Sequence, residues 1–233
     1  MLEILSNNWL LLLVGQWPNG PMGGLVATVG LALVSLLLAF PIGVLLALGR
    51  ISTHKIFYWP ATAIVYVVRG LPLIMFIFWA YFFLPLLIGN SVSGVVTMAA
   101  ALIIYEGAYL SEIIRSGIQA LPAGQMEAGR SLGLSHMQAM RKIVLPQALY
   151  NTIPSMLSQF ISTVKETSLG FVISVHELTF AAAQVNNILL TKPFEVFTLL
   201  ALTYFMLNLI LTGIVKLVEA RMGGTRTVAL GNP

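Results

Sequence analysis

Long apolar runs, separated by short polar segments, fill most of this chain. Crossing a hydrocarbon core of about 30 Å takes roughly 20 helical residues, and five runs are long enough. They cover residues 23–49, 56–88, 92–115, 143–164 and 196–215. The pattern therefore predicts an all-α, multi-pass membrane protein with five transmembrane helices. A shorter stretch, residues 9–14, is too brief to span and is expected to lie in the outer interface.

The composition supports a membrane location and excludes several kinds of chemistry. Only 9% of the residues are charged and 58% are hydrophobic, whereas soluble domains carry roughly 25% charged residues. Cysteine is absent and all eight acidic residues are Glu, so disulfides, thiolate metal sites and aspartyl chemistry are excluded. No G-x-x-x-x-G-K-[ST] loop occurs, so the chain does not bind ATP through such a loop. The net charge of +4 does not indicate nucleic-acid binding.

The basic residues predict the orientation in the membrane. Cytoplasmic loops of membrane proteins carry an excess of Lys and Arg. With the N-terminus outside and the C-terminus in the cytoplasm, Lys192 is the one basic residue in an outer loop. The cytoplasmic segments then hold Arg50, Lys55, Arg115, Arg130, Arg141, Lys142, Lys216, Arg221 and Arg226.

The polar segment between the third and fourth runs reads as two short helices. Pro122 suits the first turn of one helix and Gly133 suits its end. Ser135, with Gln138 three residues later, forms the capping-box pattern that starts a second helix. These local rules predict a compact helical hairpin below the membrane, and an ordinary hairpin without a special role satisfies them equally well.

The spacing within this segment resembles the cytoplasmic loop of bacterial ABC importer permeases. That loop reads Glu-Ala-Ala, three residues, Gly, nine residues, then Ile-x-Leu-Pro. This chain matches in the same register, except that Gly129 stands where the family usually has Ala. The resemblance implies a coupling helix that docks on an ATPase subunit. The implied coupling residues are Glu127, Ala128, Gly129, Gly133, Ser135, Ile143, Leu145 and Pro146.

The resemblance extends to residues 69–73, 106–109, 111–119 and 165–169, which are similar to permeases for polar amino acids, most of all the glutamate/aspartate type. It implies the type I ABC importer permease fold in the bacterial inner membrane, surrounded by membrane lipid. The implied partners are an ABC ATPase, a second permease (identical or homologous) and a periplasmic amino-acid-binding protein. We expect a periplasmic segment at 1–22, a transmembrane domain at 23–219 with the coupling loop at 120–145, and a cytoplasmic tail at 220–233.

Arg69 is a charged residue well inside the second run. A charge at that depth costs several kcal/mol unless it is paired or hydrated. Arg69 either faces the translocation path and attracts a substrate carboxylate, or forms a salt bridge with Glu106 or Glu166 that fixes helix packing. Glu112 and Arg115, three residues apart on the next run, are expected to form an ordinary ion pair.

A second candidate site is the polar stretch at the end of the fourth run. An amino acid presents an ammonium and a carboxylate, so its site needs an acceptor, a donor and small hydroxyl partners. All three occur within four residues, and the resemblance implies that substrate contacts gather here. The alternative is that these side chains only cap the helix at the interface. With Arg69, the candidate substrate-binding residues are Lys165, Glu166, Thr167 and Ser168.

The function that these observations favour is a permease subunit that translocates a polar amino acid, with glutamate or aspartate as the expected substrate. It needs no cofactor of its own, because the partner ATPase uses the ATP. The main alternative is a stand-alone secondary transporter or channel for amino acids. A membrane-embedded enzyme is disfavoured, since Asp and Cys are absent and no Ser/His pair stands in an active-site motif.

Overall fold

The computed structural model describes residues 1–229, and within them it is all-helical, as predicted. Those residues contain no strand beyond two isolated bridges. The last four residues of the predicted C-terminal tail lie outside the described part. In chain order the elements are α1 (Leu2–Val14), α2 (Gly24–Arg50), α3 (Lys55–Gly70), α4 (Leu73–Ile88), α5 (Gly94–Gln119), α6 (Gly124–Ser131), α7 (His136–Ala139), η1 (Met140–Val144), α8 (Leu145–Glu166), η2 (Thr167–Ile173), α9 (Leu178–Leu189) and α10 (Pro193–Ala229).

Three described helices are long and apolar enough to cross a membrane: α2, α5 and the part of α10 up to Met222. A fourth span is possible if α3 and α4 count together. The prediction of five spans is therefore not confirmed by length and composition. The predicted span that is not among these helices is α8, which has 22 residues but carries many polar side chains. Two of its hydroxyls, on Thr152 and Thr163, bond the helix's own backbone.

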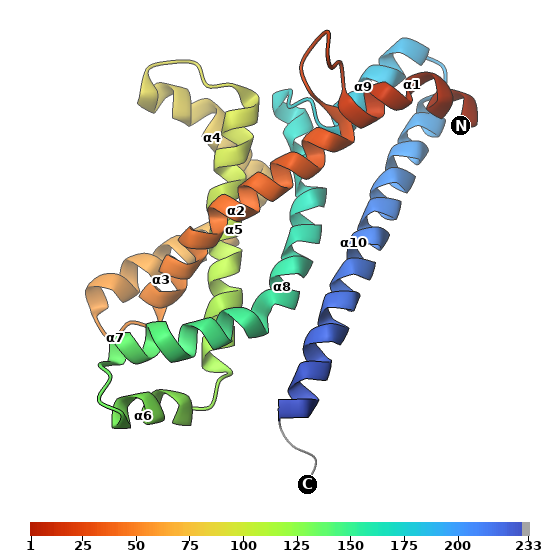
Figure 1. The fold of residues 1–233 in the computed structure, drawn as a ribbon. Helices are drawn as coiled ribbons and strands as arrows, with labels where there is room; N and C mark the ends of the chain where they lie inside the picture. Colours follow the sequence, from red (N-terminus) through yellow and green to blue (C-terminus); the bar gives the residue numbers. More distant parts are fainter. Residues whose placement is uncertain (230–233) are drawn as a thin grey trace.

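The second apolar run is interrupted at Arg69-Gly70-Leu71-Pro72 by a sharp bend between α3 and α4. The two helices meet at 107°, and Leu71 has an extended backbone. Pro72 explains this, because the residue before a proline is pushed away from the helical conformation. In Figure 1 the yellow end of α4 projects away from the bundle.

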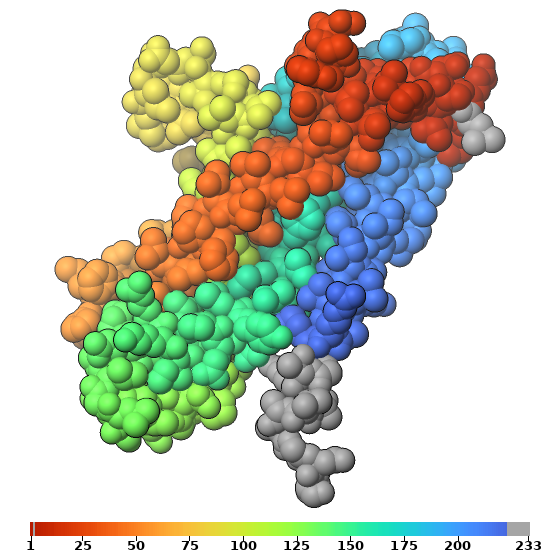
Figure 2. All heavy atoms as spheres, viewed as in Figure 1, coloured from red at the N-terminus to blue at the C-terminus, as the bar shows by residue number. Residues whose placement is uncertain are grey.

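The packing centre of the molecule is the crossing of α2 over α5 (Figures 1 and 2). Every third or fourth residue of α2 on the buried face is small. A Cβ on Gly43 would meet Leu110 at 2.8 Å, and one on Gly107 would meet Ile42 at 2.9 Å. Small residues let helix backbones approach closely, so α5 is held firmly as the scaffold of the polar residues. The buried positions of α2 are Gly24, Thr28, Ala32, Ser35, Ala39, Gly43 and Ala47.

The hairpin predicted between the third and fourth runs is confirmed as α6 and α7. Gly133 turns the chain with a φ of 84°, a left-handed conformation that favours glycine. Ser135 forms the predicted capping box with Gln138. The chain then continues through one π-helical turn, η1, into α8. Pro146 follows that turn, and its missing N–H explains why regular bonding fails there. The hairpin packs below the ends of α2 and α5 (Figure 1).

Candidate functional site

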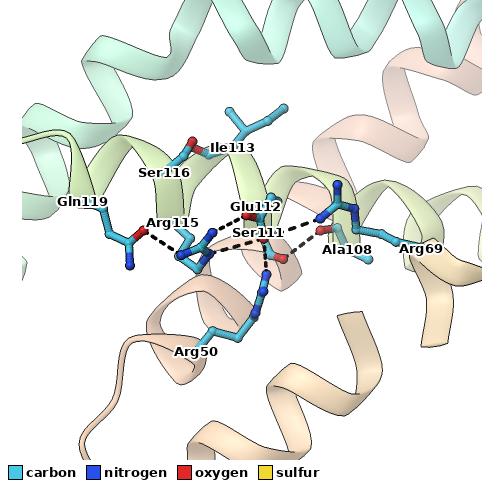
Figure 3. A network of polar contacts seen from close by, with 9 residues as sticks. All are labelled: Arg50, Arg69, Ala108, Ser111, Glu112, Ile113, Arg115, Ser116 and Gln119. Carbon is cyan, nitrogen blue, oxygen red and sulfur yellow. Dashed lines mark hydrogen bonds and ion pairs between the residues drawn. The ribbon is translucent and has the colours of Figure 1, made fainter. Parts of the chain in front are cut away.

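Three arginines gather around the carboxylate of Glu112 (Figure 3). Arg50 comes from the last residue of α2, Arg69 from the end of α3, and Arg115 from the next turn of α5. Arg50 and Arg115 form hydrogen-bonded ion pairs with Glu112, and Arg69 Nη1 lies 3.5 Å from Glu112 Oε2. These four residues, the basic cluster, tie three helices together.

The expected ion pair between Glu112 and Arg115 is confirmed. The expected structural partner of Arg69 is corrected, because its ion pair is with Glu112 and not with Glu106 or Glu166. The Arg69 guanidinium also lies over the Tyr109 ring, 5.1 Å from its centroid. Whether Arg69 also attracts a substrate carboxylate stays a prediction.

A second polar region lies between α5 and the end of α8. Glu106 is fully buried, and its Oε2 accepts a hydrogen bond of 3.0 Å from the Gln159 side-chain amide. Glu106 also interacts with the carboxyl group of Glu166. Two further oxygens, Glu106 Oε1 and Glu166 Oε2, are buried and accept no hydrogen bond from the described residues. We call Glu106 and Glu166 the acidic pair.

The acidic pair and the basic cluster are neighbours through their α5 glutamates. Glu106 and Glu112 are six residues apart, which is about 9 Å along a helix. Tyr109 lies between them in the sequence, and its hydroxyl is 3.1 Å from that of Tyr105. Like charges held close together without a counter-ion are costly inside a protein. The acidic pair is therefore suited to share a proton or to receive a positively charged group, which the basic cluster is not.

The predicted stretch from Lys165 to Ser168 stands at the junction of α8 and η2. Lys165 is exposed, Glu166 and Ser168 are half-buried, and Thr167 is buried. The Thr167 hydroxyl donates to the carbonyl oxygen of Val164 at 2.8 Å, and the Ser168 hydroxyl donates to that of Lys165 at 2.6 Å. Each hydroxyl oxygen keeps lone pairs that can accept a donor. Thus Glu166 joins Glu106, while Lys165 stays open to a ligand.

A third buried carboxylate, Glu177, is fully bonded. It caps the N-terminus of α9 by accepting from the backbone N–H groups of Thr179 and Phe180 at 2.8 and 2.9 Å. It also accepts from the Tyr204 hydroxyl of α10 at 3.0 Å. Burial raises the pKa of Glu177 to about 7, although these hydrogen bonds act to lower that pKa. Both of its oxygens have partners, so Glu177 ties α9 to α10 and needs no ligand.

Comparison with known proteins identifies the family. Residues 39–224, most of the chain, match the model of the binding-protein-dependent transport system inner membrane component. The chain belongs to this family. The resemblance to ABC importer permeases predicted from the loop is thereby confirmed.

Similar proteins of this inner membrane family span nearly the whole chain. A probable glutamine ABC transporter permease from Bacillus subtilis is 38% identical over 85% of this chain and 91% of its own length. A glutamate transport system permease from Corynebacterium glutamicum is 32% identical over 95% of this chain and 82% of its own length. A crystal structure of an amino acid ABC transporter with histidines matches with a TM-score of 0.78 at 33% identity, covering 85% and 92%.

The predicted coupling residues lie on the α6–α7 hairpin and on the helical turns that follow it. Glu127, Ala128, Gly133 and Ser135 are exposed, whereas Gly129 is buried under the facing helical turn. A Cβ on Gly129 would meet Ile143 Cδ1 at 2.7 Å and Ala139 Cβ at 3.1 Å. The departure from the family's usual Ala therefore has a steric reason. Farther along the chain, Ile143 and Leu145 are half-buried and Pro146 is exposed.

Sequence reasoning missed several residues of these regions. For Arg50, the sequence predicted only a cytoplasmic position. Its hydrogen bond to Glu112 joins residues that are 62 positions apart in the chain. Gln159 is 53 residues from Glu106, and no local pattern marks such a pairing. Leu132 and Met137 expose 82% and 69% of their surfaces at the hairpin, and their position beside a Gly turn was the available signal. Among the described residues, no group of three or more His, Cys, Asp or Glu could hold a metal ion.

Proposed function

We propose that this chain is the transmembrane permease subunit of an ABC importer that translocates a polar amino acid. The observation that carries the proposal is the capped α6–α7 hairpin. Its sequence has the spacing of the coupling loop, and the chain belongs to the matching family. The names of the relatives, which are glutamine and glutamate permeases, support an amino acid as cargo. The alternative of a stand-alone transporter has no comparable support.

The proposed topology has five spans, with the N-terminus outside and the C-terminus in the cytoplasm. In it α8 is the fourth span in chain order, because its polar side chains turn toward α5 or bond the helix backbone and so need not meet lipid. The bent pair α3–α4 counts as one span. The hairpin then lies on the cytoplasmic side, where an ATPase can reach it.

The proposed ATPase contact is the exposed end of the hairpin. Exposed apolar side chains on a polar surface mark protein interfaces, and Leu132 and Met137 provide them beside Glu127. ATP can favour one state of the pathway only through a contact that differs between states. The hairpin meets this requirement, since Met126 of α6 packs against a buried cluster that joins the ends of α2 and α5 to η1 and the start of α8.

The proposed substrate site lies at the acidic pair and the Lys165–Ser168 stretch. The substrate ammonium binds between Glu106 and Glu166, because Glu106 Oε1 and Glu166 Oε2 accept no hydrogen bond from the described residues. Lys165 attracts the substrate carboxylate. The Thr167 and Ser168 hydroxyl oxygens accept hydrogen bonds from the remaining N–H groups of the substrate ammonium. Arg69 belongs to the basic cluster and is not required for this arrangement. Glutamate or aspartate stays the predicted cargo, and glutamine is its nearest competitor.

The proposed partners are a separate ABC ATPase, a second permease and a periplasmic amino-acid-binding protein. The family's description as a component of a binding-protein-dependent system supports the binding protein. A second permease, identical or homologous, completes the pathway. No cofactor is assigned to this chain, because ATP is used by the partner subunit.

The test is uptake of radiolabelled amino acids into proteoliposomes that hold this chain with its ATPase, partner permease and binding protein. The panel contains glutamate, aspartate, glutamine and arginine. We expect ATP-dependent uptake of one polar amino acid. Uptake that needs neither ATP nor any partner would overturn the proposal in favour of a secondary transporter.

A matched glycine pair tests the hairpin in the same assay. Gly133→Val forces a β-branched residue to a φ of 84°, where such residues are outliers. Gly124→Val is its control, because both glycines have open space around them and only Gly133 has a positive φ. We expect Gly133→Val to abolish uptake and Gly124→Val to retain most of it. Equal uptake by both variants would contradict a coupling role for the turn.

A further inference from the structure

The basic cluster has more positive charge than its carboxylate neutralises. Arg50, Arg69 and Arg115 carry three positive charges, and Glu112 carries one negative charge, so the surplus is two. Glu112 is the acidic partner of all three arginines among the described residues. An uncompensated charge beside the hydrocarbon region is unfavourable. The surplus therefore favours an anion from outside the chain.

The cluster also has unused hydrogen-bond donors. A guanidinium carries five N–H groups in a rigid fork. Arg69 makes no hydrogen bond to the described residues, and its side chain is 38% exposed. Arg50 uses one N–H, on Glu112, and Arg115 uses three, on Glu112 and Gln119. Several donors from different helices are thus available at one place for an oxyanion (Figure 3).

The position of the cluster points to the source of that anion. Arg50 ends the span α2, and Arg115 lies in the last turns of α5, above the hairpin. The adjoining helix α3 exposes the aromatic residues Phe57, Tyr58, Trp59 and Tyr66. The Arg50 guanidinium lies 5.7 Å from the centroid of the Tyr66 ring. Trp and Tyr gather where a membrane meets water, so lipid headgroups can approach this cluster from α3.

We infer that the basic cluster binds the phosphate of an anionic phospholipid in the leaflet on the hairpin side. Guanidinium groups hold phosphate through paired, charge-assisted hydrogen bonds, and basic pockets between transmembrane helices bind lipid headgroups. A soluble carboxylate or inorganic phosphate uses the same chemistry. The exposed aromatic wall of α3 favours the lipid. Because α2, α3 and α5 meet at the cluster, the bound lipid braces all three helices.

The experiment is native mass spectrometry of the assembled, delipidated transporter titrated with phosphatidylglycerol or with zwitterionic phosphatidylcholine. The variants are Arg69→Gln and Arg115→Gln. Arg141→Gln is the control, because it removes one positive charge from an exposed position of η1 outside the cluster. We expect phosphatidylglycerol to bind at least tenfold more weakly to each cluster variant and normally to the control. Phosphatidylcholine binding should not change.

Competition distinguishes the sources of the anion. Inorganic phosphate and glutamate, each at millimolar concentration, are added to the wild-type complex with bound phosphatidylglycerol. Retention of the lipid is the expected result. Displacement by either anion in the wild type would overturn the lipid assignment and leave a site for soluble anions. Unchanged phosphatidylglycerol affinity in both cluster variants, with unfolding temperatures like that of the wild type, would overturn the site altogether.

Discussion

The basic cluster and the acidic pair each place one glutamate on α5, yet their charges are satisfied in opposite ways. In the cluster, Glu112 accepts hydrogen bonds from Arg50 and Arg115 and forms an ion pair with Arg69. In the pair, Glu106 and Glu166 face each other, and two of their buried oxygens accept nothing from the described residues. The comparison teaches that a glutamate inside this protein can be neutralised by arginines, as Glu112 is, or left beside a second carboxyl group, as Glu106 is.

The largest expected effect is on stability, from Glu112→Gln. The substitution leaves three guanidinium groups around a neutral side chain. Removing one partner of a buried ion pair costs about 3–5 kcal/mol, and the partial exposure of Glu112, 27% of its side chain, moves the expectation to about 3 kcal/mol. Thermal unfolding of the purified complex measures it. An unfolding temperature equal to that of Glu127→Gln, a control on the exposed hairpin, would show that the cluster does not brace the helices.

The next effect separates the acidic pair from Glu177, a buried carboxylate with bonded oxygens. Burial raises the pKa of Glu177 from 4.5 to about 7, so the folded chain holds this proton more tightly than the unfolded chain. Its contribution to stability is full below pH 4.5 and is lost as the pH rises to about 7, with an upper limit of about 3 kcal/mol. Unfolding measured from pH 4 to pH 8 should show this loss.

Glu177→Gln is the matched variant for that titration. It cannot ionise, so its stability should lack this component of the pH dependence while the other titrating groups remain. If the variant and the wild type lose the same stability between pH 4.5 and pH 7, Glu177 does not titrate in that window. This result would contradict the proposed difference between Glu177 and the acidic pair.

A tenfold or greater fall in uptake is expected from Glu166→Gln, with the complex still assembled. Neutralising one member of the acidic pair relieves repulsion but removes half of the site for the ammonium. A tenfold change corresponds to about 1.4 kcal/mol. Uptake in proteoliposomes measures the transport defect, and co-purification with the ATPase measures assembly. Glu3→Gln, at an exposed terminal position, is the control, and normal uptake by Glu166→Gln would remove Glu166 from the site.

The smallest expected effect is that of Gly129→Ala. Alanine favours a helix over glycine by about 1 kcal/mol, but its methyl would meet Ile143 at 2.7 Å and Ala139 at 3.1 Å. The two effects oppose each other, so the net change in unfolding free energy should be under about 0.5 kcal/mol. Chemical unfolding measures it. A gain of a full 1 kcal/mol would mean that Ile143 moves aside without cost.

The parts of the fold that depend on neighbouring residues could be predicted from the sequence. The turn at Gly133, the capping box of Ser135 and Gln138, and the break before Pro72 follow from local backbone chemistry. The count of spans is less secure, because hydropathy averages over α8 and does not register that Gln159 bonds Glu106.

The site could be predicted only in part, for a physical reason. Lys165 to Ser168 are adjacent in sequence, so their shared chemistry is visible there. The partner of Glu166 is Glu106 on another helix, and the partner of Arg69 is Glu112, not the acidic residues that sequence reasoning considered. Such pairings depend on how α5 packs against α3 and α8, which no local pattern encodes.

The central claim is that the acidic pair receives the ammonium of the substrate. The most direct measurement compares calorimetric binding of the transported amino acid and of its hydroxy-acid analogue, which lacks the ammonium, to the permease–ATPase complex without the binding protein. The wild-type complex should bind the amino acid at least tenfold more tightly than the analogue, and Glu166→Gln should bring the two affinities close together. An unchanged preference for the amino acid in Glu166→Gln would contradict the claim.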